Sequence, residues 1–467
     1  MKNLTTGSPT RLLLTFTLPL LIGGLLQQAY QMTDAAIIGR VLGTDGLAAV
    51  GSVGALLFLL IGFSWGSTAG LAVPVSKAFG AGNLKETKTM IAAGAYVALG
   101  IAAIITVVGL VFGRPLLNLL GTPAYLVPDA AAYLQIIAGG SILAVTFGYV
   151  GAIMRAVGDT KTPLKFGIAS GLLNALITFV VVARLGLGIP GAAAATLVAQ
   201  TCSLTAFLLF LKAKQPQLFP SKAEWRAGIK ASKESARMGL PMGLQSCAIA
   251  IGSVVLQAAV NGLGSEAIAA YTSAGRVEGI IIAPLHAFNV GVVTFVAQNR
   301  GAEQWRRIRH AVARIAVVVG GVAVALGAVQ FVFARPLVGV FLHTDVGGPI
   351  TLAVDYLRLT AFLFVLLGFK FVIRGAVQGM GNAAIPLAST IVELGIRTIV
   401  AFALVSALGL TGVALAAPLA WCGGLSVNVV AWLRTRKTLI RREQEAAQPS
   451  KILPISETLP QTLVRAA

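Results

Sequence analysis

The stretch from Leu12 to Ile38 reads LLLTFTLPLLIGGLLQQAYQMTDAAII and decides the class of fold. It is longer than the ~20 apolar residues that an α-helix needs to cross the hydrocarbon core of a bilayer. Two of its residues are unusual in such a helix. Pro19 removes a backbone hydrogen bond and favours a kink, and Asp34 places a carboxylate where charge is costly. Because loss of water favours the protonated form of a carboxylate, Asp34 is a candidate proton site and Pro19 a candidate hinge.

Polar neighbours support this interpretation of Asp34. Gln27, Tyr30 and Gln31 precede the acid within two helical turns and form a polar stripe. The alternative is that Asp34 caps the helix near Gly39 and faces interfacial water. The polar stripe favours the interpretation of Asp34 as a proton site.

The composition indicates an all-α polytopic membrane protein. Of 467 residues, 57% are hydrophobic and only 11% are charged, whereas soluble proteins carry roughly 25% charged residues. The net charge of +20 could suggest a nucleic-acid partner, but the cations lie in short loops between apolar runs, as the positive-inside rule describes. The sequence has no Walker-type, His-Glu-x-x-His or Cys-x-x-Cys motif. We therefore expect no nucleic-acid partner, no metal, no cofactor and no enzymatic activity.

Twelve apolar spans are predicted. An even number places both termini on one side, and the loops and tail on that side carry 27 of the 36 cations. Both termini are therefore expected in the cytoplasm, with the protein in the inner membrane of a bacterium. The predicted spans are 12–39, 47–74, 90–112, 129–153, 165–183, 190–211, 238–261, 267–296, 311–333, 352–373, 386–407 and 412–433.

The chain is internally duplicated with an offset of about 221 to 223 residues. Parallel six-helix halves are a transporter architecture with the substrate path between them. The sequence thus predicts two pseudo-symmetric lobes around a central cavity: residues 1–211 and 238–433, joined by a basic cytoplasmic linker (212–237) and followed by a disordered cytoplasmic tail (434–467). The matching segments are 42–49 with 263–270, 76–83 with 297–304, 155–163 with 378–386, and 188–191 with 409–412.

Over residues 10–435 the chain resembles the multidrug and toxic compound extrusion (MATE) family, and its DinF-like branch most of all. The resemblance rests on residues 31–40 (QMTDAAIIGR), 80–82, 155–159 and the eighth span from Arg276 to Asn299. It implies a twelve-helix, two-lobed antiporter that exports organic, often cationic compounds in exchange for H⁺ or Na⁺. In the DinF-like branch the first-helix acid belongs to the coupling site, and its protonation bends that helix at a proline. Asp34 and Pro19 match those positions.

The sequence departs from the family pattern at two places. DinF-like members usually carry a second acid on the fifth helix, four residues after an asparagine; here Asn174 is present but Thr178 replaces the acid. The sodium-linked branch uses a glutamate early in the seventh helix, and the span 238–261 has no acid. A single carboxylate can load one proton, whereas Na⁺ favours several oxygen ligands. We therefore favour H⁺ over Na⁺, with Asp34, Asn174 and Thr178 as the coupling site.

The C-terminal half contains further intramembrane charges. Glu393 and Arg397 are four residues apart with the acid first, which predicts an ion pair on one helical face. Such a pair can simply fix helix packing, or it can belong to a polar patch that contacts substrate. Lys370 is expected to extend its ammonium to the interface. The candidate substrate contacts are Gln27, Tyr30, Gln31, Trp65, Phe147, Arg276, Glu278, His286, Glu393 and Arg397.

Two residue patterns are interpreted as packing features. The residues 62–66 match the Gly-x-Ser-x-Gly pattern of a nucleophile elbow but lie inside a membrane span, so Gly62, Gly66 and Gly70 are expected to allow close helix packing. The three cysteines lie in apolar segments and are expected to be small packed side chains.

Together with these observations, the resemblance to the MATE family implies a secondary active multidrug efflux antiporter that works by alternating access as a monomer. Its partners would be small cationic or amphipathic compounds and membrane lipids. The alternative is a flippase for lipids or lipid-linked oligosaccharides of the same superfamily. Such proteins tend to have extra spans and a large cationic cavity, and Arg276 and Arg397 leave that alternative open.

Overall fold

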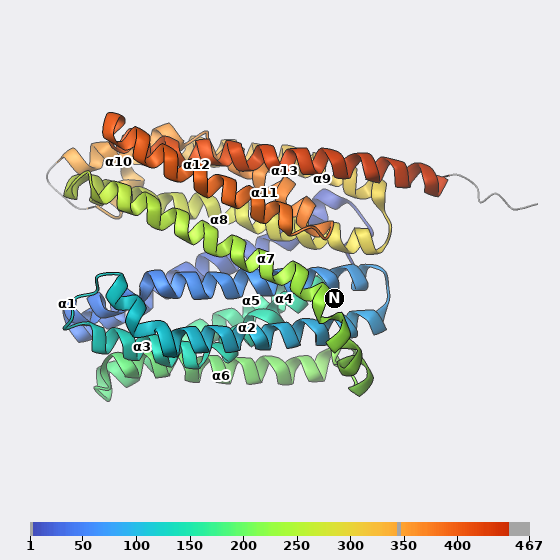
Figure 1. Ribbon diagram of the computed structural model, residues 1–467, viewed down its shortest axis with the longest axis horizontal. Helices are drawn as coiled ribbons and strands as arrows, with labels where there is room; N and C mark the ends of the chain where they lie inside the picture. Colours follow the sequence, from blue (N-terminus) through green and yellow to red (C-terminus); the bar gives the residue numbers. More distant parts are fainter. Residues whose placement is uncertain (1–2, 343–346, 448–467) are drawn as a thin grey trace, which may run out of the picture.

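The computed structural model describes residues 3–342 and 347–447 (Figure 1). Of residues 31, 34–36, 44, 45, 47, 347, 406, 446 and 447 only the backbone is described. The elements in chain order are α1 (Pro9–Gly80), α2 (Leu84–Leu119), α3 (Val127–Gly139), α4 (Ser141–Ala156), α5 (Lys161–Phe179), the π-helix η1 (Val180–Arg184), α6 (Gly188–Lys214), the 3₁₀-helix η2 (Pro216–Leu218), α7 (Lys222–Asn261), α8 (Ser265–Gly301), α9 (Trp305–Gly339), α10 (Gly347–Thr360), α11 (Phe364–Gly379), α12 (Ala384–Leu408) and α13 (Leu410–Ala447).

The helices confirm an all-α polytopic membrane protein. Within the described ranges, ten helices are long and apolar enough to cross a bilayer, and two bent pairs bring the number to twelve. The pairs are α3 with α4, bent by 48°, and α10 with α11, bent by 50°. Element α1 holds two spans, because at Gly43 (φ 70°, ψ −164°) the backbone leaves the helical region. Glycine adopts such a positive φ without steric cost.

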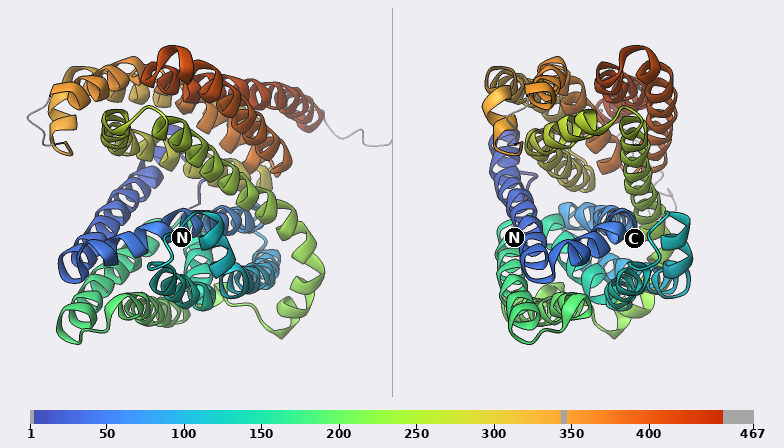
Figure 2. Two further views of the ribbon diagram at one scale, coloured as in Figure 1. Left: turned by 60° about the vertical axis from the view of Figure 1, so that its left-hand side comes forward. Right: turned by 90° about the vertical axis from the view of Figure 1, so that its left-hand side faces the viewer.

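The helices form two lobes that are joined by α7 and diverge toward one end of the molecule (Figures 1 and 2). The N-lobe contains most of α1 with α2 to α6, and one of its cores includes Ile101 and Phe207. The C-lobe contains α8 to α13, and its largest core includes Phe295 and Phe364. Each core consists of apolar side chains from several helices, so each lobe can pack as a unit.

The first helix of each half begins against the opposite lobe. Leu13 and Phe16, near the start of α1, belong to the same core cluster as Leu285 of α8. The first turn of α7 contacts α2 instead, where Glu224 lies 3.2 Å from Lys88. These two crossings tie the lobes together at one end.

The end that carries the loops 81–83, 215–221 and 302–304 is called the basic end below, because the helix ends that flank these loops are rich in Lys and Arg (Figure 1). At this end the lobes meet through backbone atoms of α1 and α8. A Cβ on Gly80 would lie 2.5 Å from the carbonyl carbon of Gln298, and a Cβ on Gly301 would lie 2.9 Å from the carbonyl carbon of Lys77. Lys77 and Gln298 are equivalent in the repeat, and so are Gly80 and Gly301. We call these four residues the glycine seam.

Glycines also allow α1 to approach α7 between the seam and the middle of the molecule. A Cβ on Gly66 would overlap Met242, and one on Gly70 would lie 2.5 Å from the carbonyl oxygen of Met238. The close helix packing expected of Gly66 and Gly70 is confirmed, whereas a Cβ on Gly62 would lie 3.9 Å from Ser246, an ordinary van der Waals distance. Replacing glycine by a larger residue here would push the lobes apart, because protein interiors have little free space.

The structure differs from the sequence expectation in the linker and the tail. Residues 212–237 are largely helical: α6 extends to Lys214, and α7 already begins at Lys222. Ser221 and Glu224 form a capping box at this start, with the Ser221 amide donating to the glutamate at 2.7 Å. The disorder expected from residue 434 does not begin there, because α13 continues to Ala447; residues 448–467 lie outside the described part.

Candidate functional site

The predicted coupling residues are placed by the packing of α1 against α5. A Cβ on Gly23 would lie 3.3 Å from Leu164, and one on Gly171 would lie 3.6 Å from the Tyr30 ring. The number of residues between Gly23 and Leu164 equals the number between Tyr30 and Gly171. The first span of α1 therefore runs in the same direction as α5, with a constant offset between facing residues. Continuing this register brings the backbone at residue 34 to the level of residues 174–178. The side chains of Gln31 and Asp34 lie outside the described residues.

Asn174 and Thr178 form a buried hydrogen-bonded group between α5 and α6. Their exposed fractions are 3% and 0%. The Thr178 hydroxyl donates to the Asn174 carbonyl oxygen at 3.3 Å, and the Asn174 amide donates to Thr196 Oγ1 at 3.0 Å. Sequence reasoning missed Thr196; its only signal was a hydroxyl within an apolar run. These three side chains supply neutral donors and acceptors.

The other predicted residues of α1 lie beside this group. Gln27 is half-buried, and the ring of the half-buried Tyr30 packs on Gly171 of α5. Pro19 is buried, and α1 keeps helical dihedral angles through it, the only departure within its described length being Gly43. Bending at Pro19 therefore stays a prediction.

Two aromatic residues predicted to contact substrate make their contacts within the N-lobe, and one of them, Trp65, is 53% exposed. Trp65 lines a small apolar pocket with residues of α1, α2, α3 and α4, including Ile105 and Ile137. Phe147 packs edge-on against Phe207, with 5.9 Å between ring centroids. Among the described residues, neither the pocket lined by Trp65 nor the ring contact of Phe147 includes a residue of the C-lobe.

A cluster of buried charges lies between α11 and α12 in the C-lobe. Lys370 of α11 forms an ion pair with Glu393 of α12, and both are nearly inaccessible, with exposed fractions of 3%. The prediction that the Lys370 ammonium reaches the membrane interface is therefore wrong. Its pairing with the buried Glu393 holds it inside the lobe. The expected pairing of Glu393 with Arg397 is also wrong, since Glu393 pairs across helices and no Glu393–Arg397 ion pair occurs among the described residues.

Two buried arginines flank this ion pair. The Arg374 guanidinium lies 4.7 Å from the Phe371 ring centroid, and its Nη2 donates to Asn289 Oδ1 at 3.4 Å. Arg397 lies beside Gly252 of α7, where a Cβ would be 2.7 Å from Nη1. Within the described residues the only ion pair of this cluster is Lys370–Glu393, so Arg374 and Arg397 have no ion-pair partner there. A buried excess of positive charge is costly, so this cluster is a candidate contact for an acidic group.

The remaining predicted residues of α8 are spread along the helix. His286 is exposed, with its ring centroid 5.8 Å from that of Phe371, so it borders the buried charges. Glu278 lies two turns away, where it accepts a hydrogen bond from Tyr356 at 3.4 Å. The Arg276 guanidinium contacts the ring of Phe341 at 5.9 Å. The structure therefore brings His286 to the cluster but not Glu278 or Arg276.

A buried amide network, which sequence reasoning missed, connects α7, α11 and α12. The Gln245 amide donates to the Pro386 carbonyl oxygen at 3.0 Å and to Thr390 Oγ1 at 2.9 Å. The Gln378 amide donates to Gln245 Oε1 at 2.9 Å. Gln245 follows Pro241 in the seventh span, and an amide in an apolar run was the available signal. The Gln378 side-chain oxygen is buried without a hydrogen-bond partner, but the three hydrogen bonds of the network join α7 to α11 and α12.

Comparison with known proteins agrees with this architecture. A family model described as MatE matches residues 19–180 and 241–403, which are the two halves of the repeat. The probable multidrug resistance protein YoeA of Bacillus subtilis is 28% identical over 404 residues, covering 83% of this chain and 85% of that protein. The FAD transporter of Shewanella oneidensis is 25% identical over 312 residues, covering 64% and 67%.

A solved structure shares the whole fold. The crystal structure of MATE in the bent conformation superposes with a TM-score of 0.86 at 21% identity, covering 95% of this chain and 98% of that one. Because the family model matches well over half of the chain and both six-helix halves, this protein belongs to the MatE family of membrane proteins, the MATE transporters.

Proposed function

We propose that this protein is a secondary active multidrug efflux transporter that exchanges small cationic or amphipathic compounds for H⁺. The name of YoeA, a probable multidrug resistance protein, supports the export of drugs. The observation that carries proton coupling is the register of α1 and α5, which brings the backbone of residue 34 level with the buried Asn174 and Thr178. A lone acid beside neutral partners is suited to one proton and less suited to Na⁺.

The exchange follows from simple electrostatics. An ionised Asp34 attracts a cationic compound, and protonation removes that attraction. One unit charge at ~4 Å with an effective dielectric constant of ~20 is worth about 4 kcal/mol. A ligand shifts a conformational equilibrium only by its differential affinity for the two states, and this energy is sufficient. Bending of α1 at Pro19 would couple the proton to the shape of the site.

The orientation is part of the same proposal. The basic end carries most of the loop cations, so the positive-inside rule places it in the cytoplasm of a bacterial inner membrane. The lobes meet at this end and diverge at the other (Figure 2). The state described here is then outward-facing, in which external protons have access to the site.

A transport assay tests the coupling. Proteoliposomes with the purified protein are loaded with a fluorescent cation, and a pH gradient or a Na⁺ gradient is imposed separately. We expect transport with the pH gradient and its loss in Asp34→Asn. The matched control is Asp129→Asn, which makes the same change at an exposed acid in the first turn of α3. Wild-type transport by Asp34→Asn, or transport driven by Na⁺ alone, would refute the assignment.

A second cargo class is supported by the C-lobe. Lys370, Arg374 and Arg397 outnumber the nearby Glu393, and the FAD transporter, a relative, is named for a cargo that carries phosphates. Acidic compounds are therefore the second candidate. The same proteoliposomes separate the two classes when a fluorescent anion replaces the cation, with Arg374→Gln as the variant expected to lose only anion transport.

A further inference from the structure

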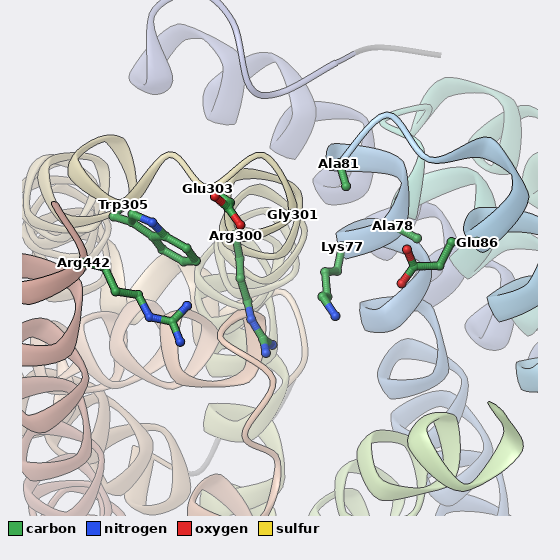
Figure 3. Close-up of a pocket in the computed structure, with 9 residues that line it drawn as sticks. All are labelled: Lys77, Ala78, Ala81, Glu86, Arg300, Gly301, Glu303, Trp305 and Arg442. Atoms are coloured by element: carbon green, nitrogen blue, oxygen red, sulfur yellow. The ribbon is translucent and has the colours of Figure 1, made fainter. Parts of the chain in front are cut away.

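A polar pocket lies at the basic end, where the two lobes meet (Figure 3). Its volume is about 250 Å³, far more than the roughly 10–15 Å³ that one water molecule requires. Both lobes contribute to its wall, so its shape depends on their closure. The lining residues are Lys77, Ala78, Ala81 and Glu86 from the N-lobe and Arg300, Gly301, Glu303, Trp305 and Arg442 from the C-lobe.

Three cations line this pocket. Figure 3 shows the side chains of Lys77, Arg300 and Arg442 extending in the same direction, two from the C-lobe and one from the N-lobe. Arg300 and Arg442 are close enough to repel each other. Across the described ranges, none of the three forms an ion pair or a side-chain hydrogen bond. Clustered cations without an ion-pair partner are favourable for an anion.

The acids nearby do not neutralise these groups directly. Glu86 accepts a hydrogen bond from Asn83 at 3.2 Å, and Glu303 is exposed at the turn between α8 and α9. Glu234 of α7 attracts Arg300 from outside the lining. None of these carboxylates is within ion-pair distance of the three cations in the part of the chain that the structure describes.

Helix ends account for only part of the arrangement. Lys77 and Arg300 lie in the last turns of α1 and α8, where the helix dipole favours cations. Arg442 lies in α13, five residues before the last residue of that helix, and its guanidinium lies 4.9 Å from the ring centroid of the buried Trp305. Neither the dipoles nor this stacking fills the space between the three cations.

We propose that this pocket binds a phosphate group, either free phosphate or the phosphate of an anionic lipid headgroup, between Lys77, Arg300 and Arg442. A phosphate offers several acceptor oxygens, and guanidinium groups match its geometry. Because Lys77 belongs to one lobe and the two arginines to the other, the bound anion bridges the lobes next to the glycine seam. It therefore stabilises the state in which the basic end is closed.

Binding is tested on the full-length protein, independently of transport. Inorganic phosphate is titrated into the detergent-solubilised protein by calorimetry, in chloride buffer of constant ionic strength. In parallel, thermal stability is compared in nanodiscs of phosphatidylcholine with and without phosphatidylglycerol. The variant is Arg442→Gln. The matched control is Arg441→Gln, which removes the neighbouring arginine that pairs with Glu445 at 2.7 Å outside the pocket.

We expect saturable stabilisation that Arg442→Gln weakens at least about tenfold in apparent Kd, because one charged hydrogen-bonding partner is lost. Arg441→Gln should behave as the wild type. Binding of inorganic phosphate identifies free phosphate as a source, whereas an effect of phosphatidylglycerol alone identifies the lipid headgroup. Absence of both effects, or equal losses in the two variants, overturns the proposal. Neither result depends on whether Asp34 couples transport to protons.

Discussion

Alanine at the glycine seam should open the basic end of the molecule. Gly80→Ala places a methyl group 2.5 Å from the carbonyl carbon of Gln298, and Gly301→Ala places one 2.9 Å from that of Lys77. Carbon atoms in contact are normally ~3.5–4.0 Å apart, so the backbones of α1 and α8 must separate by about 1 Å at Gly80. The strain exists only where the lobes touch.

The size of the effect follows from overpacking. Extra methyl groups in a packed contact cost about 1–3 kcal/mol, which corresponds to a shift of about 5- to 150-fold between two conformations. Alanine favours a helix over glycine by about 1 kcal/mol, but this gain is present whether the lobes are closed or open and cancels. We therefore expect the equilibrium to move toward the state open at the basic end, with the double variant shifted furthest.

The assay is a distance measurement across the basic end. Spin labels are placed at the exposed repeat-equivalent positions 85 and 306 in a cysteine-free background, and distance distributions are recorded in nanodiscs. The control is Gly54→Ala, since a Cβ on Gly54 in α1 meets nothing within 4 Å. Wild-type distances in both seam variants would refute the reasoning, and so would an equal shift in Gly54→Ala.

Three further predictions concern packing and the hinge. Lys370→Met should lower the free energy of unfolding by about 3–5 kcal/mol, because the buried Glu393 loses its ion-pair partner and the flanking Arg374 and Arg397 form no ion pair with it among the described residues. Thermal denaturation should show that Lys370→Met/Glu393→Gln recovers most of this loss, and a double variant as unstable as the single one contradicts the pairing. Tyr149→Phe removes a buried 2.8 Å hydrogen bond to the Ile91 carbonyl oxygen and should cost about 1 kcal/mol in the same assay, so an unchanged melting temperature would count against that bond. Pro19→Ala should strengthen α1 and slow proton-driven efflux, and efflux at the wild-type rate would show that no bending at residue 19 is needed.

The sequence was sufficient to predict the architecture because a bilayer imposes simple rules. Apolar spans of about 20 residues must be helical, since no other local structure satisfies the backbone in lipid. The repeat then implied two lobes, and the family model matches both halves. The broken spans at Gly140 and at residues 361–363 were not predicted, because a bend of about 50° changes neither the length nor the composition of an apolar run.

Partnerships between distant side chains could not be predicted in the same way. Spacing along one helix suggested that Glu393 pairs with Arg397, but the closer partner is Lys370 of another helix. The tail from residue 434 was expected to be disordered from its polarity, yet α13 continues through it, and Arg309 of α9 pairs with Glu443 at 3.0 Å. In both cases a contact with a neighbouring helix decides the outcome.

The amino-acid sequence by itself determined that this chain spans a membrane, that it is a duplicated helical protein, and that Asp34 is the acid of its leading helix, because hydropathy, repetition and an isolated charge are local properties. Only the tertiary structure decided which lobe each helix contacts, which cation neutralises Glu393, and that Gly80 and Gly301 meet the opposite lobe at a shared seam. These contacts between helices depend on differences of a few ångströms in interhelical distance, and the packing of all helices together sets those distances.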